Sequence, residues 1–193
     1  LEALEAGGKG AITVSVACGM AGMIAGCVTV TGLASKLISG VLAVTSLVPV
    51  PALAMFIGLF LTMFCCIVLG MGVPTTANFC IMASTCAPIL IKMGLPDMAA
   101  YFFVFYFGIV ADITPPVALA AYAGAAIAKA NPMKTGVNAT KLAIAAFIVP
   151  YIFAYSPAML FINVGSWLEV VQIILSALLG LFGIDAALNG NLY

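Results

Sequence analysis

The sequence predicts an all-α integral membrane protein with about five to six membrane-embedded segments. Of its 193 residues, 65% are hydrophobic and 6% are charged, and the mean hydropathy is +1.31. A soluble domain has roughly 25% charged residues, so this chain has too few charges to cover a surface in water. Its apolar runs are continuous and do not alternate with polar residues, which favours helical spans over the strands of a barrel.

Composition also excludes several function classes. The net charge is zero and the chain contains neither arginine nor histidine. Nucleic acid is excluded as a partner, because binding to phosphates needs clustered cations. The six cysteines fall inside apolar runs without a CxxC pair. We interpret them as small buried apolar side chains and not as a disulfide or metal framework.

Residues 1–51 are expected to form three pieces. Residues 1–10 are expected to form a short amphipathic helix or the end of a preceding loop, with a break at the Gly7-Gly8 pair. Residues 11–33 are apolar and long enough for a first span. Residues 34–51 mix serine, threonine and lysine with apolar side chains, which indicates an interfacial helix followed by a turn.

Residues 52–92 consist of two apolar runs that are joined by a break. The first break is Gly70-Met71-Gly72-Val73-Pro74-Thr75-Thr76-Ala77-Asn78. In a helix interior glycine costs about 1 kcal/mol and proline about 3 kcal/mol, so no regular helix is expected here. Taken alone, the pattern fits either an exposed loop between two full spans or a re-entrant hairpin, and the family resemblance given below implies the hairpin, with its tip at 70–76.

A second break interrupts the apolar run 98–130, which is too long for one span. It reads Ala111-Asp112-Ile113-Thr114-Pro115-Pro116. The two prolines lack N–H donors, and Pro115 disfavours helical geometry at Thr114, so a discontinuous helix is predicted. An acidic residue inside a membrane is costly and indicates a functional site. The alternative is that Asp112 only caps the second half of the helix.

The remaining elements are predicted from similar signals. The helix before the second break is expected to start at Leu95-Pro96-Asp97, because proline and aspartate favour a first turn. Residues 131–136 indicate a turn. Residues 142–188 predict two further spans, the first of them kinked at its two prolines.

The two breaks are alike, and this similarity points to a function. Paired interrupted helices are the best sequence indication of the binding site of a secondary transporter. In such a site unwound carbonyls and threonine hydroxyls coordinate Na⁺, and helix N-termini face an anionic substrate. No arginine is available here for a bidentate carboxylate clamp.

Three motifs give the chain a resemblance to a known family. They are Gly70-Met71-Gly72-Val73-Pro74-Thr75-Thr76-Ala77; Phe103-Val104-Phe105-Tyr106-Phe107-Gly108 through Asp112-Ile113-Thr114-Pro115-Pro116-Val117-Ala118-Leu119-Ala120-Ala121-Tyr122; and Asn131-Pro132-Met133-Lys134-Thr135-Gly136 with Phe147-Ile148-Val149-Pro150 and Tyr155-Ser156-Pro157-Ala158. Together they resemble the large membrane subunit of tripartite ATP-independent periplasmic (TRAP) transporters, and most closely the fused permeases paired with TAXI-type binding proteins.

The resemblance implies a fold of inverted repeats, each with a re-entrant hairpin and a broken helix, of which this chain holds the second. It implies an inner-membrane permease that imports organic anions, such as carboxylates, by an elevator-type movement driven by Na⁺ and supplied by a periplasmic binding protein. The implied Na⁺ site residues are Gly70, Gly72, Asp112 and Thr114. The implied residues close to substrate are Thr75, Thr76, Asn78, Pro115 and Pro116.

Length is where the chain departs from this family, whose members have two repeats. The chain is therefore expected to be a fragment or a gene product cut short. Its expected partners are membrane lipid, the binding protein, the organic anion, and either the missing first repeat or a small membrane subunit. No cofactor is expected beyond Na⁺ as the coupling ion.

Two other function classes are alternatives to transport. A membrane-embedded enzyme that uses Asp112 is disfavoured, because no acid pair or histidine lies at a plausible spacing. A structural membrane subunit, or a fragment of another anion/Na⁺ symporter without independent transport activity, is the runner-up. A purely structural role explains the many small packing residues but not the paired breaks.

Overall fold

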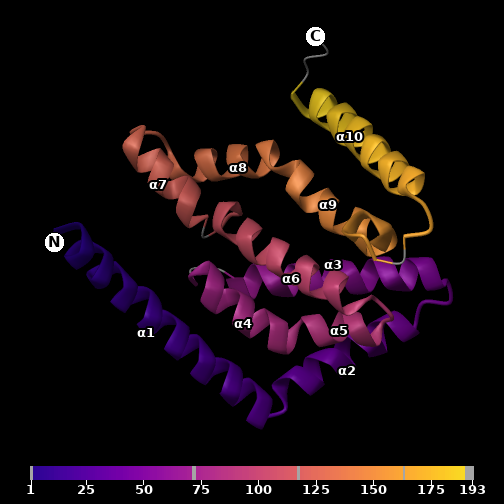
Figure 1. The fold of residues 1–193 in the computed structure, drawn as a ribbon, viewed down its shortest axis with the longest axis horizontal. Helices are drawn as coiled ribbons and strands as arrows, with labels where there is room; N and C mark the ends of the chain where they lie inside the picture. Colours follow the sequence, from indigo (N-terminus) through magenta and orange to yellow (C-terminus); the bar gives the residue numbers. More distant parts are fainter. Residues whose placement is uncertain (1, 71–72, 117, 163, 190–193) are drawn as a thin grey trace.

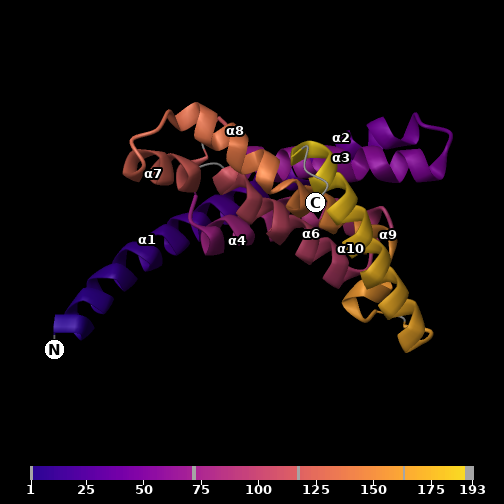
Figure 2. The same cartoon turned by 90° about the horizontal axis from the view of Figure 1, so that it is seen from above.

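The computed structural model describes residues 2–70, 73–116, 118–162 and 164–189. Their secondary structure is helical, with no β-strand within those ranges. Most of the helices pack into one elongated body, and the N-terminal end of the first helix extends beyond it (Figures 1 and 2).

The first helix, α1, spans Glu2–Val30 without interruption. The predicted break at Gly7-Gly8 is therefore wrong. Each glycine costs about 1 kcal/mol in a helix, whereas an unpaired backbone group in a bilayer costs several kcal/mol, so the helix continues. The predicted first span, 11–33, falls within α1 and the corner after it. That corner uses Gly32, whose φ of 66° lies in the left-handed region that glycine favours.

The interfacial helix predicted for the next segment corresponds to α2, Leu33–Ser46. It is followed by α3, Pro51–Gly70, which brings the chain to the first break. Beyond the break, α4, Thr75–Thr85, turns back alongside α3, and α5, Ala87–Lys92, continues in the same direction (Figure 1). The region 52–92 thus folds back on itself at the glycine- and proline-containing break.

The discontinuous helix is confirmed as local structure. After Leu95-Pro96, α6 spans Asp97–Val110, with Asp97 in its first turn as predicted. A short 3₁₀ segment, η1, follows at Ala111–Ile113, and the chain becomes helical again only at α7, Leu119–Ile127. The N-cap of α7 is Ala118, without a side-chain hydrogen bond, so the alternative in which Asp112 caps this helix is wrong.

The turn predicted at residues 131–136 is also wrong, because α8 spans Pro132–Leu142. Asn131 is its N-cap, and the Asn131 Oδ1 accepts a hydrogen bond of 3.1 Å from the Lys134 backbone N–H. An asparagine cap followed by proline at the first helical position is a helix start, and the polar composition of this segment concealed it.

The C-terminal part consists of α9, Ile144–Tyr155, the 3₁₀ segment η2, Pro157–Leu160, and α10, Trp167–Asn189. The proline inside α9 does not end that helix, whereas the next proline starts η2. Among the described residues, three helical stretches are long and apolar enough to cross a membrane: Pro51–Gly70, Pro132–Tyr155 and Trp167–Leu188. The second of these begins before the predicted boundary at residue 142.

Helix α6 lies at the centre of the packing, in contact with α3, α4, α5 and α9. Its Phe103 and Phe107 are fully buried, and their ring centroids are 4.8 Å apart. Tyr151 of α9 adds an edge contact to Phe103 at 5.6 Å. In lipid such close packing, more than apolar transfer, is what holds helices together. The central helix therefore fixes α3 and α4, which flank the first break, relative to its own C-terminal end, where the second break begins.

Candidate functional site

The two breaks lie against each other. Gly70 ends α3, and a Cβ placed on it would lie 2.7 Å from the Asn78 Nδ2 and 2.8 Å from the Ala111 Cβ. Both distances are shorter than a real Cβ contact, so only glycine fits here without a shift of its neighbours. The end of α3 is thus pressed between the first turn of α4 and the start of η1.

Asn78 links the first break to the central helix. It is 1% exposed, and its Nδ2 donates a hydrogen bond of 3.1 Å to the carbonyl oxygen of Gly108 on α6. Gly108 allows this approach, since a Cβ on it would lie 3.2 Å from the same nitrogen. The other amide atom, Oδ1, is buried and has no hydrogen-bond partner among the described residues. An unpaired buried acceptor costs about 1–3 kcal/mol, and in native proteins such an atom is accounted for by a bound water, an ion or local strain.

The other predicted residues of the first break are less enclosed. The Gly70 carbonyl accepts one long hydrogen bond, 3.4 Å, from the Val73 N–H. Thr75 and Thr76 form the exposed first turn of α4. Gly72 lies outside the described residues.

In the second break, Thr114 turns its hydroxyl back to the preceding helix. Its Oγ1 donates a hydrogen bond of 2.7 Å to the Val110 carbonyl, and its N–H donates to the Ala111 carbonyl over 3.2 Å. Asp112 is partly buried in η1 and forms no ion pair within the described ranges. The break therefore presents a carboxylate and a hydroxyl oxygen beside backbone that has left the helix.

Pro115 and Pro116 are turned toward the elements that follow them. A Cβ on Gly136 of α8 would lie 3.3 Å from the Pro115 Cγ. The Pro116 carbonyl accepts a hydrogen bond of 2.7 Å from the Tyr122 Oη of α7. In the part of the chain that the structure describes, no hydrogen bond joins either proline to Thr75 or Thr76. The structure thus brings Gly70 and, of the predicted substrate residues, Asn78 to the start of the second break.

Several residues at the breaks were missed by reasoning from the sequence. The Thr140 Oγ1 of α8 donates a hydrogen bond of 3.1 Å to the Ile113 carbonyl, and no local signal marks this residue. Gly108 and Tyr122 lie inside the quoted family motifs, although no role was given to either. Gly136 is the last residue of the segment 131–136, which was interpreted only as a turn.

The cavity that reaches the second break offers few polar atoms. A cavity of about 400 Å³ reaches Ile113, and its lining is apolar and aromatic. Within the described ranges, no group of three histidine, cysteine, aspartate or glutamate side chains could hold a metal ion. A cation at the breaks would have to depend on backbone carbonyl, amide and hydroxyl oxygens together with Asp112.

A family model described as "Tripartite ATP-independent periplasmic transporter, DctM component" matches residues 1–168. The match includes both breaks and ends at the start of α10. No curated protein and no solved structure matches the chain. A DctM component is a membrane permease subunit of the inner membrane and not an enzyme, and its tripartite system includes a periplasmic binding protein and a small subunit. The chain therefore belongs to the family of DctM components of tripartite ATP-independent periplasmic transporters.

Proposed function

We propose that the chain is the permease part of a Na⁺-coupled secondary transporter that imports organic anions, carboxylates in particular, delivered by a periplasmic binding protein. Family membership supports the transport role. The observation that carries the ion coupling is Asn78, whose buried Oδ1 has no partner among the described residues at the place where both breaks meet. Pairing with a TAXI-type binding protein is part of the proposal and rests on the sequence motifs.

The proposed Na⁺ site lies between the two breaks. A hydroxyl that donates its hydrogen keeps its lone pairs, so the Thr114 Oγ1 remains able to bind a cation. The Gly70 carbonyl, with its single long hydrogen bond, and the Asp112 carboxylate complete the set that the described residues offer. Gly72 stays in the proposal as a further carbonyl donor.

In this proposal Asn78 binds the ion and not the substrate, because its side chain is buried. Its side chain is buried against α6, where an organic anion has no access, and its unpaired amide oxygen is a type of ligand that hard cations prefer. Substrate contact is left to Thr75 and Thr76, at the exposed N-terminus of α4, whose free N–H groups and partial positive charge favour a carboxylate. Pro115 and Pro116 remain substrate candidates on the side of the second break.

The same proposal assigns membrane roles to the helices. The region 52–92 is a re-entrant hairpin with its tip at 70–76, and the region 98–130 is a helix broken within the membrane. Residues 142–188 supply two further spans. This unit is one half of an inverted-repeat transporter that moves its site across the membrane like an elevator. The paired breaks support this arrangement, because binding sites of such folds lie at discontinuous helices.

The test is uptake by the intact permease, reconstituted in liposomes with its binding protein. A panel of radiolabelled mono- and dicarboxylates is offered with an inward Na⁺ gradient, with K⁺ in its place, and without binding protein. We expect uptake of at least one carboxylate that requires both the Na⁺ gradient and the binding protein. Uptake that is unchanged in K⁺ would remove Na⁺ coupling, and no uptake under any condition would favour a structural subunit.

The same uptake assay also tests which residues bind Na⁺. Thr114→Ala and Asp112→Asn are expected to weaken the dependence of uptake on Na⁺, since each removes an oxygen ligand or its charge. Asp97→Asn, at the exposed start of α6, is the matched control and should leave that dependence intact. If both site variants behave like the control, the ion is bound elsewhere.

A further inference from the structure

Helices α7 and α8 cover the second break on the side away from α3 and α4. They pack against each other and against η1 (Figures 1 and 2). Two side-chain hydroxyls from these helices donate to carbonyls of the break. The Tyr122 Oη binds the Pro116 carbonyl at 2.7 Å, and the Thr140 Oγ1 binds the Ile113 carbonyl at 3.1 Å. Each carbonyl lies where the regular helix has ended, and each would otherwise need another donor.

Gly136 lets α8 approach the break closely. A Cβ on this buried residue would lie 3.2 Å from the Tyr122 Cε1, 3.3 Å from the Pro115 Cγ and 3.5 Å from the Ala118 Cβ. These atoms line the break from Pro115 to the first turn of α7. A methyl group at residue 136 would therefore displace the break or move α8 away from it.

The Thr140 hydroxyl has two acceptors for one hydrogen. Besides the Ile113 carbonyl at 3.1 Å, the Gly136 carbonyl of its own helix lies 3.0 Å from the same Oγ1. A threonine hydroxyl carries a single hydrogen, so the two acceptors compete for it. When the hydrogen turns to Gly136, the Ile113 carbonyl is released without leaving the hydroxyl unpaired.

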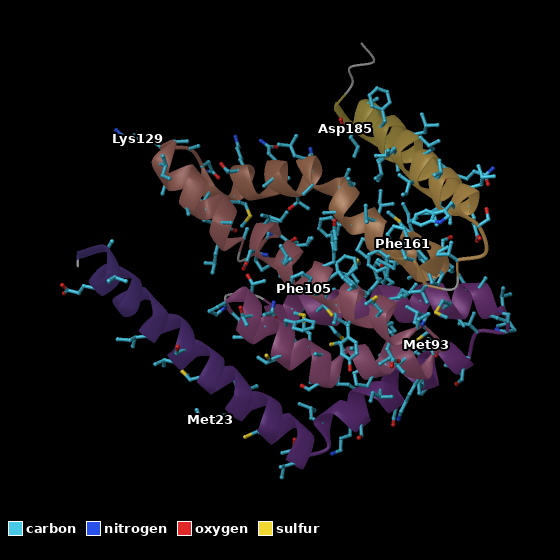
Figure 3. All side chains as sticks on the ribbon, viewed as in Figure 1. Met23, Met93, Phe105, Lys129, Phe161 and Asp185 are labelled. Carbon is cyan, nitrogen blue, oxygen red and sulfur yellow. The ribbon has the colours of Figure 1, made fainter. Side chains whose placement is uncertain are left out.

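Helix α8 is held independently of these contacts. Its N-cap, Asn131, accepts from the Lys134 N–H at 3.1 Å, and its carbonyl accepts from the Thr135 Oγ1 at 3.0 Å. The α7–α8 connection projects from the body, and Lys129 marks its tip (Figure 3). The start of α8 is thus fixed by hydrogen bonds at Asn131, which do not involve the break.

We propose that α8 is a positioning element for the coupling-ion site, acting through Thr140 and Gly136 together with Tyr122 of α7. These residues hold the backbone of the second break in its ion-binding geometry and do not touch the ion. This inference rests on the proposed function, because it takes the break to be part of a Na⁺ site. Substitutions at these residues change the affinity for Na⁺ while the ion's own ligands remain in place.

The test uses Na⁺ as the probe and needs no substrate. The intact permease is purified in detergent, and its melting temperature is measured against NaCl concentration, with choline chloride keeping the ionic strength constant. Thr140→Val removes the donor at nearly constant shape. We expect the NaCl concentration for half-maximal stabilisation to rise roughly two- to tenfold, the range that one hydrogen bond supplies.

Matched controls separate positioning from folding. Thr140→Ser keeps the hydroxyl and is expected to restore the Na⁺ response of the unmodified protein. Thr135→Val lies on the same helix and loses a hydroxyl that bonds only to the Asn131 carbonyl, away from the break. It is expected to leave the Na⁺ response unchanged.

Gly136→Ala gives a second, independent arm. Alanine favours a helix over glycine by about 1 kcal/mol, and the new Cβ opposes this gain by crowding its neighbours, so a merely structural role of residue 136 predicts a changed melting temperature with an unchanged Na⁺ response. The proposal predicts a weaker Na⁺ response, because the new Cβ crowds the break. Tyr122→Phe should behave in the same way. Tyr155→Phe is its control, since the Tyr155 Oη donates to the Ala52 carbonyl at 3.3 Å, at the end of α3 that lies away from the break.

The outcomes separate this inference from the proposed function. If the unmodified permease is stabilised no more by NaCl than by choline chloride, the Na⁺ site itself is refuted and its positioning residues with it. If NaCl stabilises it, and Thr140→Val and Gly136→Ala both keep the original Na⁺ response, only the positioning role is overturned. Should Thr140→Val fail to fold, Gly136→Ala and Tyr122→Phe decide the question.

Discussion

The Asn78 Nδ2, in the first turn of α4, donates a hydrogen bond of 3.1 Å to the Gly108 carbonyl near the end of α6. This contact joins the start of the helix after one break to the end of the helix before the other. Gly70 and Ala111 pack beside it, so the junction is both hydrogen-bonded and sterically closed.

Asn78→Ala is expected to lower the stability of the permease and to abolish its response to Na⁺. The Gly108 carbonyl loses its buried donor, which costs about 1–3 kcal/mol of unfolding free energy, and the proposed ion loses an oxygen ligand. Melting temperature with and without NaCl measures both effects. Asn138→Ala, on the exposed face of α8, is the control. Equal behaviour of the two variants would show that the buried amide has no special role.

Gly70→Ala is expected to destabilise the junction by about 1–3 kcal/mol, because the new Cβ would lie 2.7 Å from the Asn78 Nδ2 and 2.8 Å from the Ala111 Cβ. Gly40→Ala, in the interior of α2, meets nothing within 4 Å and is expected to stabilise by about 1 kcal/mol. Thermal unfolding of the two variants should shift in opposite directions. If both variants shift the melting temperature in the same direction, the close approach at Gly70 is contradicted.

Thr114→Val is expected to raise the Na⁺ concentration needed for half-maximal uptake by about tenfold or more, since losing a contact to a charged partner costs about 1.5–3 kcal/mol. Thr62→Val is a close match, because the Thr62 Oγ1 also donates to a carbonyl four residues earlier, that of Gly58 at 2.8 Å, but inside the unbroken α3. It removes the same kind of bond without touching a break. The idea fails if both variants shift the Na⁺ dependence equally.

Phe103→Ala is expected to destabilise the fold by about 3–5 kcal/mol, because this fully buried ring touches Phe107 and Tyr151 at the centre of the packing. Phe102→Ala, whose ring is 43% exposed on the same helix, should change stability far less. Resistance to unfolding in detergent compares the two. Similar losses would show that the buried face of α6 contributes no more to stability than its exposed face.

Both breaks could be predicted from the sequence because their causes are local. Glycine and proline at Gly70–Pro74, and two successive prolines after Thr114, prevent a regular helix whatever packs around them. The helix start at Asp97 follows from the same kind of local rule. The start of α8 was also encoded locally, at Asn131-Pro132, and its polar composition led to the wrong interpretation as a turn.

The contacts across the breaks could not be predicted in this way. Asn78 and Gly108 meet only because α4 lies along α6, and Thr140 and Ile113 meet only because α8 folds back over η1. Neither pairing leaves a periodic or compositional mark in the sequence. The same holds for the close approach of Gly70 to Ala111, which depends on how three helices pack.

The junction of Gly70, Asn78 and Ala111 has a mechanical consequence. Two breaks that are distant along the chain meet at this junction, so a single cation bound there would act as a reversible cross-link between them. With the cation bound, the region 52–92 and the broken helix 98–130 would move as one rigid unit. Without the cation, the Asn78–Gly108 hydrogen bond and the packing of α3 and α4 on α6 would still hold the two sides together, so the proposed ion would stiffen a junction that already exists.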